Sequence, residues 1–135
     1  NTDPYPRCAN DDPRRAGERK RVLLVEDEPM VRKVTRRMLE SLGYEVIVAV
    51  DGRAGLARFR REHEALDLVM TDVSMPQMTG FELFDAIQSV NPRVPVVICS
   101  GYASEDELRF RTAAPRAFLR KPYRRAQLAE LLEAS

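Results

Sequence analysis

The sequence predicts an α/β fold, a doubly wound sheet of five parallel strands with helices on both of its faces. From about residue 21, short apolar runs alternate with amphipathic segments, which is the pattern of repeated βαβ units. The apolar runs lack the polar alternation of strands that face water, as expected for strands covered on both faces. The 135 residues suffice for one such domain around one apolar core.

The first three strands share one pattern, in which a turn or loop separates each apolar run from a helix. The first strand covers residues 22–25, and Pro29 then suits the first position of a helix that ends at Gly43. The second strand covers residues 45–50 and stops at an Asp-Gly turn signal before the next helix. The third strand covers residues 68–71 and leads through a loop with proline and methionine to a third helix.

Two further strand–helix units complete the predicted sheet. The third helix starts at about Gly80, and the fourth strand covers residues 94–99. A helix over residues 105–112 follows, because Ser104 suits its N-cap and a glutamate three residues later completes a capping box. Residues 117–119 form a short fifth strand, and the last helix buries a stripe of leucines.

Residues 1–20 are expected to form a disordered linker or tail before a domain of residues 21–135, because three prolines and few apolar residues cannot offset the entropy of ordering. The 22 basic and 21 acidic residues leave a formal charge of +1, so the overall charge argues neither for a nucleic-acid binder nor for a membrane-surface protein. Two cysteines fit a reducing compartment, and we see neither a secretory signal nor an apolar run as long as a membrane span. A cytoplasmic location is therefore expected.

Polar residues follow four of the predicted strands. They are Glu26 and Asp27 after the first, Asp72 after the third, Ser100 after the fourth and Lys121 after the fifth. In a parallel sheet of order 2-1-3-4-5, ligands bind at the carboxyl edge between the first and third strands, where the strand order reverses. Acids crowded at that edge would repel one another, so a bound cation is the simplest answer. Carboxylate oxygens suit Mg2+ or, by substitution, Mn2+.

A carboxylate beside such a cation can act as a nucleophile toward phosphorus. The metal, an amine and a hydroxyl would then stabilise charge on the transferring group. Asp72, Lys121 and Ser100 supply these three side chains. Taken singly, each residue has an ordinary interpretation, such as Asp27 as a helix cap or Asp72 as a turn former. Taken together, they indicate a site for phosphoryl transfer.

Four strings at these positions resemble the receiver domain of two-component response regulators and hybrid histidine kinases. The strings are VLLVEDEP, DLVMTDVSMPQMTG, VVICSGYA and FLRKPY, and the resemblance extends from about Arg21 to the end of the chain. It implies a flavodoxin-like fold and a phospho-accepting domain of a phosphorelay. The implied partner is a histidine kinase or a histidine phosphotransfer domain, with no direct contact to nucleic acid or membrane, and the domain is expected to be a monomer or weak dimer. It would assist only its own phosphoryl transfer and dephosphorylation rather than be an enzyme.

The resemblance also implies roles for individual residues of the predicted site. Asp72 corresponds to the phosphoacceptor. Glu26, Asp27 and Asp72 correspond to the acidic ligands of Mg2+, and the backbone carbonyl of Ser74 corresponds to a further ligand. Lys121 corresponds to the amine that pairs with the phosphoryl group.

A two-state switch is implied in the same way. Ser100 would bind a phosphoryl oxygen, and Phe118 would follow it inward. These residues stand where threonine and tyrosine are frequent in the family, so the hydroxyl and the ring are kept but a phenolic hydrogen bond is lost. Tyr102 is implied to influence how fast water reaches the acyl phosphate, and the Lys121-Pro122 peptide bond is a candidate cis bond.

The residues of this chain fit other functions less well. The alternative is a receiver-like interaction module that is never phosphorylated, and the complete set of site residues argues against it. A phosphatase with an aspartyl intermediate would need a second acid where this chain has Ser74, and a flavin or dinucleotide binder would need a glycine-rich or hydroxyl-rich turn after the first strand. Two points stay open: the shape of the fourth helix, because residues 113–116 lack the family's usual glycine, and whether the domain is free-standing or the terminal receiver of a hybrid kinase.

Overall fold

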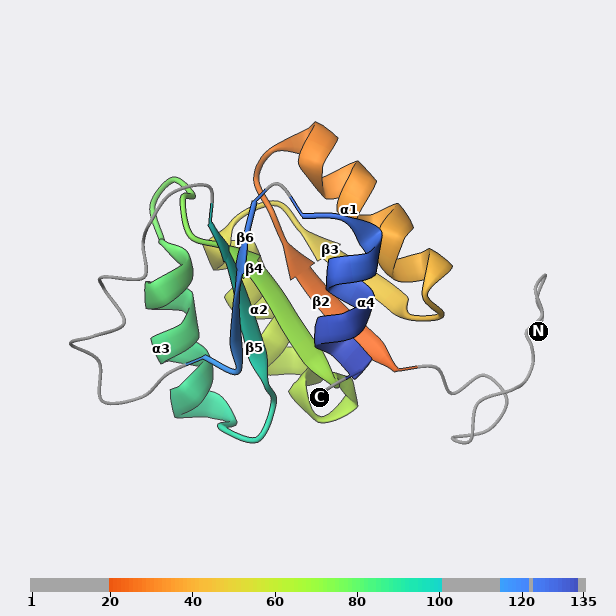
Figure 1. The fold of residues 1–135 in the computed structure, drawn as a ribbon. Helices are drawn as coiled ribbons and strands as arrows, with labels where there is room; N and C mark the ends of the chain where they lie inside the picture. The colour runs from red at the N-terminus through yellow and green to blue at the C-terminus, as the bar shows by residue number, and fades with distance from the viewer. Residues whose placement is uncertain (1–19, 101–114, 122, 134–135) are drawn as a thin grey trace.

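The structure, a computed structural model, describes residues 20–100, 115–121 and 123–133. All the strands of its sheet are parallel and lie in the order β3-β2-β4-β5-β6 (Figure 1), which confirms the predicted order 2-1-3-4-5. The strands are β2 (Arg21–Val25), β3 (Glu45–Ala49), β4 (Leu68–Asp72), β5 (Val96–Ser100) and β6 (Ala117–Arg120). Each begins or ends within two residues of its predicted bounds.

Helices cover both faces of the sheet. They are α1 (Pro29–Ser41), α2 (Gly52–Glu62) with the short η1 (His63–Ala65), α3 (Gly80–Val90) and α4 (Arg125–Glu133). Figure 1 shows α1 and α4 side by side on one face, with α2 and α3 on the other. The predicted helix over 105–112, its cap Ser104, and the predicted roles of Tyr102 and Pro122 lie outside the described residues, as do residues 1–19 of the predicted tail.

Two apolar clusters, one on each face, form the core. Val22 and Leu24 of β2 pack toward α1 and α4, whereas Leu23 and Val25 pack toward α2 and α3. All four side chains are almost completely buried. Successive residues of a strand point to opposite faces, so a strand covered on both sides needs an unbroken apolar run. This explains why the first run shows no polar alternation.

The loop between β4 and α3 brings the start of α3 against the end of β4. Thr79 and Glu82 form a capping box at the start of α3, and the backbone amide of Gly80 donates to the carbonyl of Val73 over 2.9 Å. A methyl group on Gly80 would meet the backbone carbonyl of Asp72. The position therefore requires glycine because of a close backbone approach.

We expect Gly80→Ala to lower the free energy of unfolding by about 2 kcal/mol, because the added methyl overlaps backbone atoms that cannot move without shifting the strand end. Urea denaturation measures this difference. Ser89→Ala, at an exposed position of the same helix, is the matched control and should change the free energy by no more than about 0.5 kcal/mol. Equal losses in the two variants would contradict the steric argument.

Candidate functional site

The carboxyl edges of β2 and β4 bring three acids together. Glu26 and Asp27 directly follow β2, and Asp72 is the last residue of β4. The two strands are paired with Val25 opposite Thr71, so the acids come at the same level of the sheet. One carboxylate oxygen of each acid lies within 4.8 Å of those of the other two. The prediction that these acids meet at the point where strand order reverses is confirmed.

Burial raises the cost of charge in this cluster. Glu26 is 4% exposed and Asp72 is 8% exposed. Burial, and then the charge of Asp72, raise the pKa of Glu26 above its ordinary value of 4.5, although Lys121 acts in the opposite direction. Without a metal ion, ionising all three acids of the site is therefore unfavourable. A bound cation would offset the repulsion between the ionised carboxylates.

Lys121, which directly follows the edge strand β6, bridges two of the acids. Its Nζ lies 2.8 Å from Oδ1 of Asp72 and 3.2 Å from Oε1 of Glu26. Its backbone amide donates to the carbonyl of Ser100 over 2.7 Å, which extends the β5–β6 ladder by one residue. Burial alone would lower the pKa of Lys121, but the hydrogen bonds and charges of Asp72 and Glu26 outweigh it and raise that pKa. The amine is therefore a cation at neutral pH.

The charges and the ligand atoms of this cluster fit a divalent metal ion. Three carboxylates and one ammonium leave two negative charges when all are ionised. Carboxylate oxygens are the ligands that Mg2+ prefers, and a cation that keeps several waters needs only a few of them from the protein. The donor set therefore fits Mg2+.

The other predicted site residues lie around this cluster. Ser100 is buried at the end of β5, one residue beyond Cys99, which pairs with Asp72 in the sheet. Ser74 is exposed in the loop after β4, where it lines an open hollow with Asp27. Phe118 lies on β6, half-buried, with its ring stacked on Phe81 of α3 at a centroid distance of 6.2 Å. The ring of Phe118 thus packs into the core on the α3 face rather than into the acid cluster.

Two contacts at the site were not predicted from the sequence. Nη1 of Arg32 donates to the backbone carbonyl of Glu26 over 2.8 Å, so this residue of α1 holds the loop that carries the acids. Thr35 of α1 is hydrogen-bonded to Tyr123 over 2.8 Å. The only local signal for the contact of Arg32 is that a basic residue follows an acidic pair by a few positions. Basic residues are common on solvated helices, so this signal is weak. The N-cap of α1 is Glu28, so Asp27 is not the plain helix cap that a single-residue interpretation would make it.

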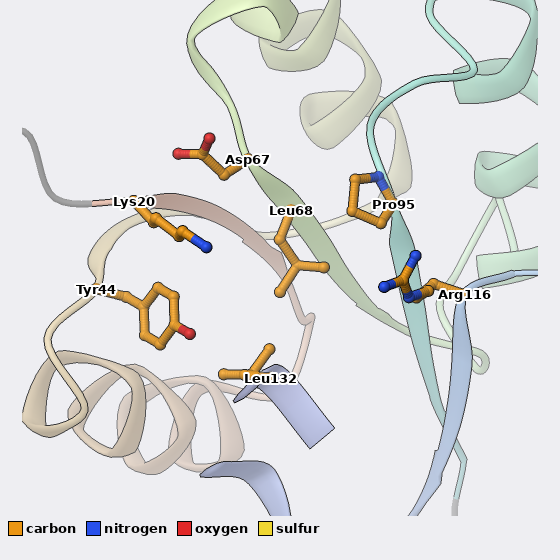
Figure 2. Close-up of a pocket in the computed structure, with 7 residues that line it drawn as sticks. All are labelled: Lys20, Tyr44, Asp67, Leu68, Pro95, Arg116 and Leu132. Carbon is orange, nitrogen blue, oxygen red and sulfur yellow. The ribbon is translucent and has the colours of Figure 1, made fainter. Parts of the chain in front are cut away.

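A second cavity lies at the opposite edge of the sheet, where the strands begin. Its volume is about 170 Å³. Figure 2 shows the amine of Lys20, the hydroxyl of Tyr44 and the guanidinium of Arg116 around a floor of Leu68 and Leu132. Because parallel strands all point the same way, this cavity is separated from the acid cluster by the length of the strands.

We expect Mg2+ to raise the melting temperature of the protein more at about pH 8 than at about pH 5. In the metal-free fold the raised pKa of Glu26 means that its ionisation costs stability as the pH rises from 4.5 through that raised value. A divalent cation binds the ionised form and offsets this cost only at higher pH. Thermal unfolding with and without Mg2+ measures the effect.

The matched variant for this prediction is Glu26→Gln. It removes the titrating group, so the loss of metal-free stability on raising the pH should become smaller than in the unsubstituted protein. The increase in melting temperature with Mg2+ should also become smaller, because one ligand charge is gone. A Mg2+ effect that is the same at both pH values would contradict the assignment of these acids to a cation site.

The fold and this edge define a doubly wound α/β domain with a candidate divalent-cation site at its topological switch point. The response regulator receiver domain matches residues 22–133 of the chain. The chain therefore belongs to the response regulator receiver domain family.

Relatives of the chain include both transcription regulators and sensor kinases. It is 35% identical over 113 residues to the transcriptional regulatory protein GlrR of Escherichia coli K12, covering 83% of this chain and 25% of the relative. It is 38% identical over 117 residues to the sensor kinase CckA of Brucella abortus, covering 83% of this chain and 12% of the relative. The chain thus spans a quarter or less of the length of these two relatives.

A solved structure supports the fold and gives a context for the acids. The receiver domain of a sensor histidine kinase from Pseudomonas aeruginosa PAO1, solved with a magnesium ion coordinated in its active-site cleft, superimposes with a TM-score of 0.77 at 29% identity. The match covers 86% of this chain and 96% of that structure. Among the helices that the structure describes, none is long and apolar enough to cross a membrane.

Proposed function

We propose that this chain is a phospho-accepting receiver of a two-component phosphorelay, in which Asp72 takes a phosphoryl group from a phosphohistidine of a histidine kinase or a histidine phosphotransfer domain. One observation carries the proposal: the amine of Lys121 lies 2.8 Å from Oδ1 of Asp72, within the cluster that also contains the carboxylates of Glu26 and Asp27. An acid, an amine and a cation site around one point are the groups that phosphoryl transfer to a carboxylate needs.

The proposed step forms a bond between a carboxylate oxygen of Asp72 and phosphorus while the bond from phosphorus to the histidine nitrogen breaks. The product is a mixed anhydride, and the histidine, which carries a proton on its other ring nitrogen, leaves as neutral imidazole. Bound Mg2+ supplies positive charge to the phosphoryl oxygens. Glu26, Asp27, Asp72 and the backbone carbonyl of Ser74 would hold the ion, and Mn2+ could replace it.

The two remaining polar groups act on the transferred phosphoryl group. Lys121 stays protonated, in keeping with its raised pKa, and moves its hydrogen bond from Asp72 to a phosphoryl oxygen. The hydroxyl of Ser100, at the end of the neighbouring strand, donates to another oxygen. Each such donor stabilises charge that is present on the transferring group in the transition state.

We extend the proposal to a conformational switch. Movement of Ser100 toward the phosphoryl group would open space beside β6, and Phe118 would move into it from its stacked position on Phe81. Tyr102 and a cis Lys121-Pro122 bond stay part of this proposal on the strength of the family resemblance alone.

An apolar surface beside the acids suits a partner that delivers the phosphoryl group. Met30 and Val34, one helical turn apart on α1, are 67% and 48% exposed, and Val50 after β3 is 52% exposed. Met30 and Val50 both follow strand ends at the carboxyl edge, which is where a phosphohistidine must arrive. We propose that these side chains contact the kinase or phosphotransfer domain in the cytoplasm. Outside this contact the domain is a monomer or weak dimer, either free-standing or joined to a longer kinase.

A small phosphodonor tests the proposed function without a partner protein. We expect incubation with an acyl phosphate and Mg2+ to increase the intact mass by one phosphoryl group, and a chelator to prevent the increase. The alternative, a receiver-like module that binds partners without being phosphorylated, predicts no increase in either case. It also predicts no response to beryllofluoride with Mg2+, whereas a receiver should show shifts of the amide resonances near Ser100 and Phe118.

A further inference from the structure

A partly buried hydrogen bond ties Tyr123, two residues after Lys121, to helix α1. Oγ1 of Thr35 and the phenolic oxygen of Tyr123 lie 2.8 Å apart and come from positions 88 residues apart in the chain. Thr35 is 2% exposed, and Tyr123 is half-buried. Burial raises the pKa of Tyr123, so the phenol keeps its proton and can donate or accept. Hydroxyl groups that lose water in this way need partners inside the protein, and the phenol also faces the buried thiol of Cys99.

Lys121 depends on distant anchors to reach the acids. Among the described strands β6 lies at the edge of the sheet, so its main-chain ladder within this part of the structure is with β5 alone. The backbone of Lys121 makes one such bond, to Ser100, while its amine has to reach Asp72 and Glu26 on strands beyond β5. If the backbone next to Lys121 could move, its amine would no longer stay within hydrogen-bond distance of the acids.

Helix α1 offers the fixed point that this segment lacks. The guanidinium of Arg32 joins α1 to the backbone of Glu26, and Thr35, one turn later on the same helix, joins it to Tyr123. Helix α1 thus contacts both the loop that carries the acids and the residue two positions after Lys121. These two contacts fix the distance between the acids and the amine.

We propose that Tyr123 is a positioning residue for phosphoryl transfer: its hydrogen bond to Thr35 holds Lys121 where the amine meets Asp72. This inference rests on the proposed function and adds a residue pair that acts on the rate through Lys121. The ring of Tyr123 also packs against the apolar cluster beside α1 and α4. The positioning role belongs to the hydroxyl, so Tyr123→Phe separates it from the packing of the ring.

The test measures the rate of labelling by an acyl phosphate at saturating Mg2+. We expect Tyr123→Phe and Thr35→Val each to slow labelling roughly threefold to tenfold, with no further loss when they are combined, because both remove the same hydrogen bond. Thr35→Ser keeps a hydroxyl and should restore most of the rate. The Mg2+ concentration for half-maximal labelling should stay unchanged, since the acids that would hold the ion are intact.

The decisive comparison is made in a Lys121→Ala background. If the hydroxyl acts through the amine, Tyr123→Phe should have no further effect on labelling there, whereas a general loosening of the fold would slow both backgrounds equally. Ile87→Val, a buried change on the opposite face of the sheet, controls for a modest loss of stability and should leave the rate unchanged.

The outcomes separate this inference from the proposed function. If the unsubstituted protein is not labelled, the proposed function itself fails. If the unsubstituted protein is labelled and the Tyr123→Phe variant is labelled at the same rate, the positioning role is overturned. It is also overturned if Tyr123→Phe slows labelling equally whether residue 121 is lysine or alanine.

Discussion

Asp72→Asn is expected to abolish phosphoryl incorporation from an acyl phosphate in the presence of Mg2+. The amide keeps the size of the side chain but is not a nucleophile toward phosphorus at neutral pH, and it removes one of the charges that would hold the cation. The fold should stay intact, because the amide has the shape of the acid, can still accept a hydrogen bond from Lys121 and no longer repels Glu26 and Asp27. Intact mass after labelling and circular dichroism of the same sample measure both effects.

Asp51→Asn is the matched control for this variant. Asp51 caps α2 by accepting from the amide of Ala54 over 2.8 Å, and asparagine caps helices as well as aspartate does. This control should be labelled like the unsubstituted protein. Undiminished labelling of Asp72→Asn would remove Asp72 as the acceptor.

Lys121→Ala is expected to slow labelling by about a hundredfold, because the amine 2.8 Å from Oδ1 of Asp72 would no longer stabilise the transferring group. The same change removes a positive charge that competes with a metal ion for the acids. Mg2+ should therefore bind at least as tightly as before, measured by thermal shift against Mg2+ concentration.

Lys33→Ala, at an exposed position of α1, removes a lysine away from the acids and should change neither property. The opposite effects on rate and on Mg2+ affinity distinguish a lysine that acts on the phosphoryl group from one that merely stabilises the site. Parallel loss of both would contradict the role given to Lys121.

The sequence was sufficient to predict the sheet, its order and the meeting of the acids, because each of these follows from local patterns and from the rules of parallel sheets. Its errors concern strand ends. The fourth strand was predicted from residue 94, whereas β5 starts at Val96. Val94 is buried as part of the loop before the strand, so an apolar residue there indicates core and not strand. In the sequence, a buried loop residue and a buried strand residue both appear as an apolar residue, so the local pattern does not distinguish them.

Contacts between distant elements could not be predicted in this way. The pairing of Thr35 with Tyr123 and the second ion pair of Lys121, with Glu26, depend on how α1 and β6 pack on the sheet. A basic residue on a helix face is usually solvated, yet Arg32 of α1 holds the backbone of Glu26. Such partners are specified by the assembled fold rather than by spacing along the chain.

The most direct test of the account locates the phosphoryl group chemically. Protein labelled with an acyl phosphate and Mg2+ is reduced with borohydride, which converts a carboxyl phosphate to an alcohol, and the altered residue is identified by peptide mass spectrometry. The account predicts the alcohol at Asp72 and at no other acid. An alcohol at Glu26 or Asp27, or a phosphate that survives reduction on Ser74 or Ser100, would contradict it.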